Sequence, residues 1–379
     1  MWESSAGQQW PIGVEIGTDH LRMAQIQQRR GSTRLVVESR EAPPHLNEGE
    51  PGYERAVSDL LAGMLKKPAG FRGRRVVSGL PNHRLLCRML RLAPMPPDEL
   101  AKAAHWKMAA ELGVKADGFQ SSVLNLGTTT VGDKARIEVA CIGADNQSLK
   151  QHTAILTAAG LKPVAIDAST CAAVRCIGRL QETEAFPPQV LVLELTPACA
   201  MLAVAEGSKL SFVRALGEGL VRSHQLVANM LGVTLAQSAR LHDDPWVETV
   251  AAVTPRGETS ASVEVTPARV RDAVVDAASM YARDLARQIT LSLHHLSEAL
   301  GRSIPAAGVL VGPCTLPPEA LAALSAQTRI SFVPAARLPE AAWERDLHDA
   351  EAGANPQSWL TAVGLSLYRE PDPLSREAA

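Results

Sequence analysis

Two stretches of this chain share one pattern: PIGVEIGTDHLRMAQIQ, Pro11 to Gln27, and VLVLELTPACAMLAVAEGSKLSFVRAL, Val190 to Leu216. Each begins with an apolar or alternating strand, passes an acidic residue at a turn, Glu15 or Glu194, and continues into a second strand. Such runs, with turn residues between them, are typical of strands with a buried face. The chain therefore contains the same hairpin twice, about one domain apart.

Length and composition limit the class of protein. The chain has 379 residues, more than the ~250 to 300 at which a single core stops growing, so two domains are expected. Apolar residues make up 46% and charged residues 21%, as in an ordinary globular protein. The formal net charge of -2 provides no general attraction to phosphate backbones, so no nucleic-acid partner is expected.

The cysteines and the two ends of the chain bear on its compartment. The six cysteines have no CxxC spacing, which predicts buried free thiols in a reducing cytosol. The first residues, MWESSAGQQWP, lack the pattern of a secretion signal, and no apolar run approaches the ~18 residues needed to span a bilayer. The tail after Tyr368 is polar and interrupted by prolines. We expect a cytoplasmic protein, with any attachment to a membrane made through a partner.

The rest of the chain divides into further helices and strands. Strands at 121–127 and 135–144, separated by TTTVGDK, follow a helix that begins near Asp98, and together they predict a small α+β insert. Phe186 to Pro188 mark a domain boundary. Apolar residues recur every three or four positions over 270–301, which predicts a helix of ~45 Å.

Several motifs together carry a resemblance to a known family, over Ile12 to about Arg369. They are VEIGTDHLRMAQI, VVSGLP, RMLRLAPMPPDELAKAAHWKMAAELG, AAGLKPVAIDASTCAAVR, GVTLAQSARL and the closing GLSLYR, besides the second hairpin. With these the chain resembles the PilM family of type IV pilus assembly, which is similar to the cell-division protein FtsA. The resemblance implies a duplicated, ribonuclease H-like α/β fold of the actin and sugar-kinase type.

The same resemblance implies a division into subdomains. Subdomain 1A comprises 12–79, 163–186 and 358–370. The insert 1C, which replaces the 1B subdomain of actin, comprises 80–162. Subdomains 2A and 2B comprise 187–357.

The family binds ATP and Mg2+ between its two hairpins, and its motifs can be carried over to this chain. The implied binding residues are Glu15, Gly17, Thr18, Arg22, Glu194, Thr196, Gly217 and Gly312.

The chain departs from the family pattern at four contacts. Glu15 replaces the usual Asp; Thr196 and Pro197 replace a glycine turn; Pro313 replaces a glycine after Gly312; and a ribose- and base-binding Glu and Lys become Ala239 and His242. Phosphate cradles need glycine turns with N–H groups, and proline has no N–H. The sequence therefore predicts a degenerate ATP site and no catalytic residue.

The resemblance implies a scaffold rather than an enzyme. Its expected partner is the cytoplasmic N-terminal peptide of a PilN-like inner-membrane protein, bound in the cleft between 1A and 1C, with pilus motor ATPases and PilO-like proteins as further partners. A homo-oligomer stays open. Two alternatives remain: an ATP-binding or ATP-hydrolysing member of the actin and sugar-kinase superfold, and a GspL-like adaptor of type II secretion.

Other residues have simpler interpretations. His294, His295 and Glu298 are better explained by the exposed face of a helix than by a metal site. The basic run KKPAGFRGRR, 66–75, fits a solvated helix end better than a contact with anionic lipid or an acidic partner. Trp106 belongs either to the core or to a peptide groove.

Overall fold

The computed structural model describes residues 10–18, 20–29, 32–43, 49–66, 70–181, 187–243, 266–299, 301–335 and 355–369. Two five-stranded sheets have the same order and the same directions, β3-β2-β1-β4-β8 and β11-β10-β9-β12-β13. In each, the first hairpin is antiparallel and the next two strands are parallel to its first strand. The repeated sequence pattern thus corresponds to a repeated sheet.

The strands of the two sheets have the following bounds. Sheet 1 comprises β1 Ile12–Ile16, β2 His20–Arg29, β3 Ser32–Glu41, β4 Arg75–Leu80 and β8 Lys162–Ala168. Sheet 2 comprises β9 Gln189–Leu195, β10 Cys199–Glu206, β11 Lys209–Glu218, β12 Ala307–Val311 and β13 Ser331–Pro334.

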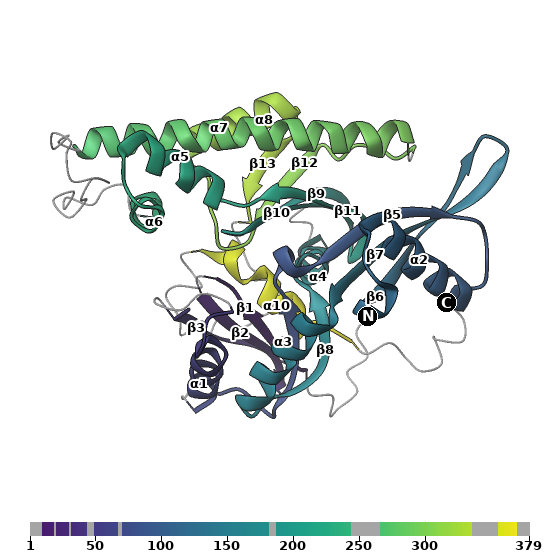
Figure 1. Cartoon of the computed structure of the whole chain (residues 1–379), viewed down its shortest axis with the longest axis horizontal. Coiled ribbons are helices and arrows are strands. Elements are labelled where there is room, and N and C mark those ends of the chain that lie inside the picture. Colours follow the sequence, from purple (N-terminus) through teal and green to yellow (C-terminus); the bar gives the residue numbers. More distant parts are fainter. Residues whose placement is uncertain are drawn as a thin grey trace.

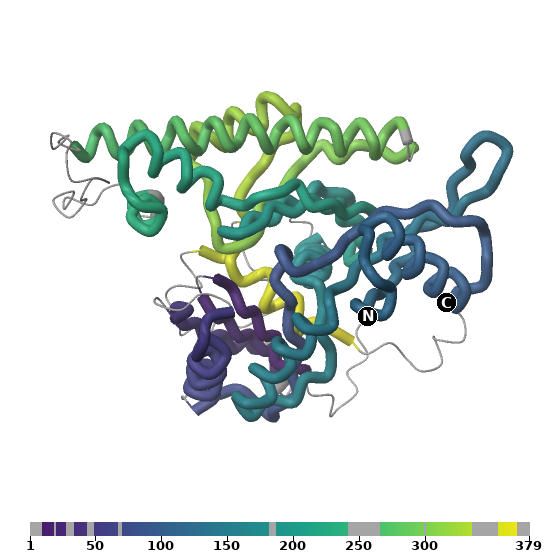
Figure 2. Tube along the Cα trace, in the orientation of Figure 1, coloured from purple at the N-terminus to yellow at the C-terminus, as the bar shows by residue number. Residues whose placement is uncertain are grey.

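Helices cover both faces of each sheet (Figure 1). Helices α4 (Ser169–Gln181) and α10 (Leu360–Ser366) share one core with the inner faces of both sheets. Helices α1 (Tyr53–Lys66) and α3 (Asn146–Ala158) cover the outer face of sheet 1. Helices α7 (Pro267–His294) and α8 (Pro318–Thr328) cover the outer face of sheet 2. The tube in Figure 2 shows the C-terminal segment, in yellow, returning from the second half to the first.

A third sheet, order β5-β7-β6, lies beside the second half of the molecule. Its strands are β5 Leu86–Leu92, β6 Phe119–Val131 and β7 Lys134–Asp145. Helix α2 (Pro97–Leu112) packs on one face, and the other face shares a small core with β10 and β11. The described part is completed by α5 Val221–Leu231 and α6 Leu235–Asp243, which pack against α7.

The structure refines several sequence expectations. The turn predicted at TTTVGDK is present but shorter than expected, because β6 continues to Val131 and β7 begins at Lys134, which leaves a two-residue turn between them. Trp106 is 67% exposed and so does not belong to the core. Cys87 and Cys171 are half-buried, while the other four cysteines are buried, and all six are free thiols. In the described ranges, no helix combines the length and the apolar character needed to cross a membrane.

Candidate functional site

The two hairpins meet where the parallel strands of both sheets end. Glu15, Gly17 and Thr18 from the first hairpin line one cavity together with Glu194 and Thr196 from the second. Ligands bind preferentially at the carboxyl ends of strands in α/β sheets. The duplication therefore places five of the predicted residues at one site.

The first hairpin turn is closed by its own backbone. The N–H of Gly17 donates to the carbonyl of His20, at 2.9 Å. Thr18 is exposed at the tip, whereas Glu15 is 9% exposed and lies directly opposite Arg22, which is 4% exposed, in the antiparallel pair. Opposite charges at directly paired positions of two strands favour a hairpin. Arg22 therefore lies in the strand pair below the turn.

The second hairpin turn is closed more tightly. The N–H of Thr196 donates to the carbonyl of Cys199 at 3.1 Å, which repeats the bond made by Gly17. In addition, the Thr196 hydroxyl oxygen accepts from the N–H of Cys199 at 3.0 Å. The carbonyls of Thr196 and Pro197 accept from Leu220 and Val221 at the start of α5, at 3.0 and 2.9 Å. The second turn therefore accepts hydrogen bonds from the start of α5 and is also closed by hydrogen bonds between its own residues.

The loop after β12 is engaged in a similar way. The N–H of Gly312 donates to the carbonyl of Gln357 at 3.1 Å, and the amide of Gln357 donates to the carbonyl of Cys314 at 3.0 Å. Gly312 has φ of +97°, and a Cβ there would lie 2.4 Å from the carbonyl oxygen of Leu195. Gly312 is therefore required for close packing of the loop on the second hairpin.

Glu194 is the buried acid of the site. Its side chain is 1% exposed, and Thr170, in the first turn of α4, donates to its carboxylate at 2.5 Å. The Thr170 hydroxyl also lies 3.3 Å from Oδ1 of Asn82. Burial raises the pKa of Glu194, and the hydrogen bond from Thr170 opposes the rise. The carboxyl group thus joins β9 to α4 and to the turn after β4.

The space between the two hairpins is small compared with a nucleotide. The cavity has a volume of about 30 Å³, enough for a few water molecules. The N–H groups of Gly17, Thr196 and Gly312 are engaged within the protein, and Pro197 and Pro313 have none. At these five positions the turns therefore offer no free N–H group to a phosphate.

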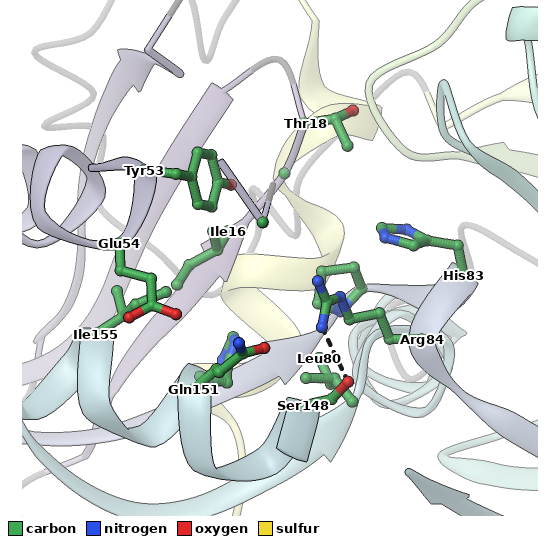
Figure 3. Close-up of a pocket in the computed structure, with 14 residues that line it drawn as sticks. Ile16, Thr18, Tyr53, Glu54, Leu80, His83, Arg84, Ser148, Gln151 and Ile155 are labelled. Carbon is green, nitrogen blue, oxygen red and sulfur yellow. Dashed lines mark hydrogen bonds between the residues drawn. The ribbon is translucent and has the colours of Figure 1, made fainter. Parts of the chain in front are cut away.

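A second small cavity, also of about 30 Å³, lies on the other side of the first hairpin turn. Figure 3 shows Glu54, Gln151 and Arg84 pointing toward one another across it. Arg84 donates to the hydroxyl of Ser148 at 2.9 Å, and Ser148 donates to Asp145 at 2.6 Å. The N–H of Ser148 also donates to Asp145, at 2.7 Å, which caps α3, so these polar groups are engaged at the start of that helix.

A larger groove separates the three-stranded sheet from sheet 1, with a volume of about 330 Å³. Strands β6 and β8, each at the edge of its own sheet, both line it. Leu124, Ile142 and Ile166 contribute apolar walls, and Ser122 and Asp167 contribute polar groups. An edge strand offers unpaired N–H and C=O groups to an extended segment. The groove therefore has the chemistry of a peptide site.

Comparison with known proteins identifies the fold. A chain of the "PilM-PilN type IV pilus biogenesis complex" matches with a TM-score of 0.72 and 20% identity, over 94% of this chain and 97% of that one. The chain has an actin-like fold. The actin-like body also matches the ethanolamine utilization protein EutJ from Carboxydothermus hydrogenoformans, with a TM-score of 0.51 and 11% identity, over 96% of this chain and 90% of that one. No protein-family model matches the sequence, and no curated protein matches it.

The fold predicted from the resemblance is confirmed. The structure brings five of the eight predicted site residues together and places the other three elsewhere. Glu15, Gly17, Thr18, Glu194 and Thr196 come together. Arg22 is buried within sheet 1, Gly217 is exposed on β11, and Gly312 packs behind the second hairpin. Their role in binding a nucleotide stays a prediction, as do the subdomain limits.

Sequence reasoning did not identify Thr170, Asn82 or Gln357. Thr170 follows a strand at the start of a helix, which is a recognisable signal for a residue at the site. Asn82 and Gln357 carry no signal, because their partners are far away in the sequence.

His294 and His295 are exposed at the end of α7. Across the described ranges, no group of three or more His, Cys, Asp or Glu is placed to hold a metal ion.

Proposed function

We propose that this chain is a non-enzymatic, actin-like scaffold of type IV pilus assembly. Its ligand is the cytoplasmic N-terminal segment of a PilN-like inner-membrane protein, bound in the groove between β6 and β8. Binding to such a protein brings the scaffold to the inner membrane, where PilO-like proteins and pilus motor ATPases are further partners.

The groove is the observation that carries the proposal. It lies between the strands of the proposed insert, 80–162, and sheet 1, and it is bounded by two edge strands. An extended peptide would pair with an edge strand and place alternate side chains in the apolar walls. The likeness to a chain of a PilM–PilN complex supports a PilN-like partner.

The hairpin turns support a scaffold over a nucleotide enzyme. Phosphoryl transfer depends on N–H groups and metal ions that neutralise phosphate charge. Here the equivalent N–H groups close the turns and the loop after β12. These bonds hold the turns in one conformation, and the bond from Thr170 of α4 to Glu194 of β9 joins the first half to the second, which suits a protein that presents a constant surface.

The proposal is tested by calorimetry with the N-terminal peptide of the PilN-like protein encoded in the same genome. We expect binding by the wild-type chain and a loss of at least about tenfold in Ser122→Trp, whose indole would fill the groove. Ser122 is exposed on β6, so the substitution leaves the core unchanged.

The matched control is Thr130→Trp, which adds the same side chain to an exposed position of the same strand outside the groove. It should bind like the wild type. Failure of the wild-type chain to bind the peptide, or equal losses in both variants, would exclude the groove as the binding site.

A further inference from the structure

The turn between β4 and β5 forms one end of the peptide groove. Its residues Asn82–Arg84 make a short 3₁₀ helix, and Leu85, directly after it, lines the groove. The N–H of Leu85 donates to the carbonyl of Asn82 at 3.1 Å, whereas Leu80, before the turn, is held by a hydrogen bond from Ser169 to its carbonyl at 3.1 Å. A displacement of Asn82 therefore moves Leu85 and changes one wall of the groove.

Hydrogen-bonding groups connect Asn82 to the second hairpin. The Thr170 hydroxyl lies 3.3 Å from Oδ1 of Asn82 and 2.5 Å from the carboxylate of Glu194. All three side chains are buried, with exposed fractions of 5% or less. The Thr170 hydroxyl has a single proton, so it can donate a full hydrogen bond to only one of its two neighbours.

The proton on Glu194 decides which neighbour receives that bond. An ionised carboxylate only accepts, so Thr170 donates to Glu194 when the carboxyl group is ionised. A protonated Glu194 can donate to the Thr170 oxygen, and Thr170 then donates to Asn82. The charge of Glu194 is thus coupled to the hydrogen bonding of the turn.

The structure has the features of the protonated arrangement. Burial raises the pKa of Glu194, and Thr170, Asn82 and Thr361 of α10 oppose the rise. Nevertheless, Nδ2 of Asn82 and Oγ1 of Thr361 have no hydrogen-bond partner among the described residues. A buried anion would draw both donors to itself, because an uncompensated buried charge is costly. The groove as it stands therefore accompanies a neutral Glu194.

Other titratable groups face Glu194 from the elements packed against it. Burial raises the pKa values of Cys171 in α4 and Cys199 in β10, so both thiols stay protonated near neutral pH. Glu15 of the first hairpin and His83 of the turn line the same cavity as Glu194. The sequences of β12 and α10 contain no titratable residue. A test must therefore separate Glu194 from Glu15 and His83.

We propose that Glu194 positions the wall of the peptide groove through Thr170 and Asn82. When Glu194 ionises, Thr170 bonds to the carboxylate and the Asn82 amide is drawn toward it, together with Leu85. The groove then binds its peptide less well as pH rises. The effect on a ligand rests on the proposed function, whereas the movement of the turn is a property of this chain alone.

Methyl NMR of the full chain tests the movement without a ligand. The Leu85 methyl signals should titrate between about pH 4.5 and pH 8 in the wild type. They should stay constant in Glu194→Gln, which cannot ionise. Leu124, on the β6 wall of the groove, is the internal reference and should not titrate. A Leu85 titration that persists in Glu194→Gln, or none in the wild type, overturns the proposal.

Two variants separate movement of the turn from the field of the charge and from other titrations. In Asn82→Ala the carboxyl group still ionises but can no longer draw the turn, so the Leu85 titration should disappear. Persistence in this variant would show that Leu85 senses the charge alone, and it would overturn the proposal. His83→Gln, at an exposed position of the turn, should titrate like the wild type; loss of the titration there would assign it to His83.

Calorimetry with the PilN-like peptide tests the effect on the groove. The wild-type affinity should fall about tenfold over the same interval, which corresponds to a shift of one unit in the pKa of Glu194 on binding. Glu194→Gln should keep the affinity of the protonated wild type throughout. An equal dependence on pH in both chains overturns the proposal. Failure of the peptide to bind at every pH would reject the proposed ligand, while the Leu85 titration would still decide the role of Glu194.

Discussion

At the scale of single residues, Glu194 shows how an acid of the actin-like hairpin serves structure. It is buried, accepts a hydrogen bond from Thr170 at 2.5 Å, and has its pKa raised by burial. Glu15, the equivalent acid in the first hairpin, instead lies opposite Arg22. The two copies of one motif have thus acquired different electrostatic surroundings.

The raised pKa of Glu194 makes stability depend on pH. Above the usual pKa of about 4.3, the folded state keeps a proton that the unfolded state releases, so stability falls as pH rises through the interval up to the folded pKa. Glu194→Gln cannot ionise and should escape this loss. Thermal melts should show the variant gaining on the wild type between about pH 4.5 and pH 8.

Glu319→Gln, at an exposed position on α8, is the control for a change of charge alone. Its melting temperature should differ from the wild type by the same small amount at both pH values. A pH-independent difference for Glu194→Gln would show that its carboxyl group does not keep a proton in the folded state.

A second prediction at this scale concerns the nucleotide. Because the N–H groups of Gly17, Thr196 and Gly312 already have carbonyl acceptors, calorimetry with Mg-ATP should detect no binding in the micromolar range. Opening the turns would cost several hydrogen bonds of about 1 kcal/mol each. Micromolar binding with turnover that is lost in Glu15→Ala would contradict both this prediction and the proposed scaffold role.

At the scale of elements, α10 joins the two halves. It lies with α4 between the two sheets, and all its residues are buried. A Cβ on Gly364 would lie 1.8 Å from the carbonyl oxygen of Ala172 in α4. The two helices therefore touch through their backbones, which only glycine allows.

Gly364→Ala should consequently destabilise the protein by roughly 2 to 4 kcal/mol, since both helices would have to shift within a packed core. Chemical denaturation measures the change. Gly63→Ala is the matched control, because Gly63 is exposed in α1 with nothing within 4 Å of the added methyl group. The control should gain about 0.5 to 1 kcal/mol; equal effects would exclude the backbone contact.

Much of the element order could be predicted from the sequence, and the reasons are local. The hairpins, the insert and the long helix have clear periodicity. The helix expected over 270–301 is α7, Pro267–His294, which continues as a short π-helix, His295–Ala299. The use of Gly312 and Thr196 as packing and capping residues could not be predicted, because it depends on Gln357 and Leu220, to which no sequence pattern connects them. The groove could be expected only as a cleft between subdomains, because its walls come from different sheets.

At the scale of the whole molecule, one arginine connects the three-stranded sheet to the second half. Arg302 donates to the carbonyls of Ser211 in β11 and Leu126 in β6, at 2.8 and 2.7 Å. It also lies 3.4 Å from the carboxylate of Glu138 in β7, which is 2% exposed and receives a second bond from Arg91 at 3.2 Å. This cluster fixes one wall of the groove to sheet 2.

Arg302→Met should therefore do more than lower stability. It leaves the buried carboxylate of Glu138 with less compensation, a loss of roughly 3 to 5 kcal/mol, and it releases the contact between β6 and β11. Hydrogen exchange should become faster in β6 and β7 than in sheet 1, and the peptide affinity of the groove should fall because its wall is no longer held in place.

Arg287→Met provides the comparison, because Arg287 pairs with Asp284 on the solvent side of α7, where the two side chains are 76% and 49% exposed. Removing an exposed pair costs about 0 to 1 kcal/mol, so exchange in β6 and β7 should stay as in the wild type. If Arg302→Met destabilised all three sheets equally and left the peptide affinity unchanged, Arg302 would contribute to global stability alone. Selective loosening of β6 and β7 with weaker peptide binding would instead show that the second half positions the groove, although it contributes none of the residues that line it.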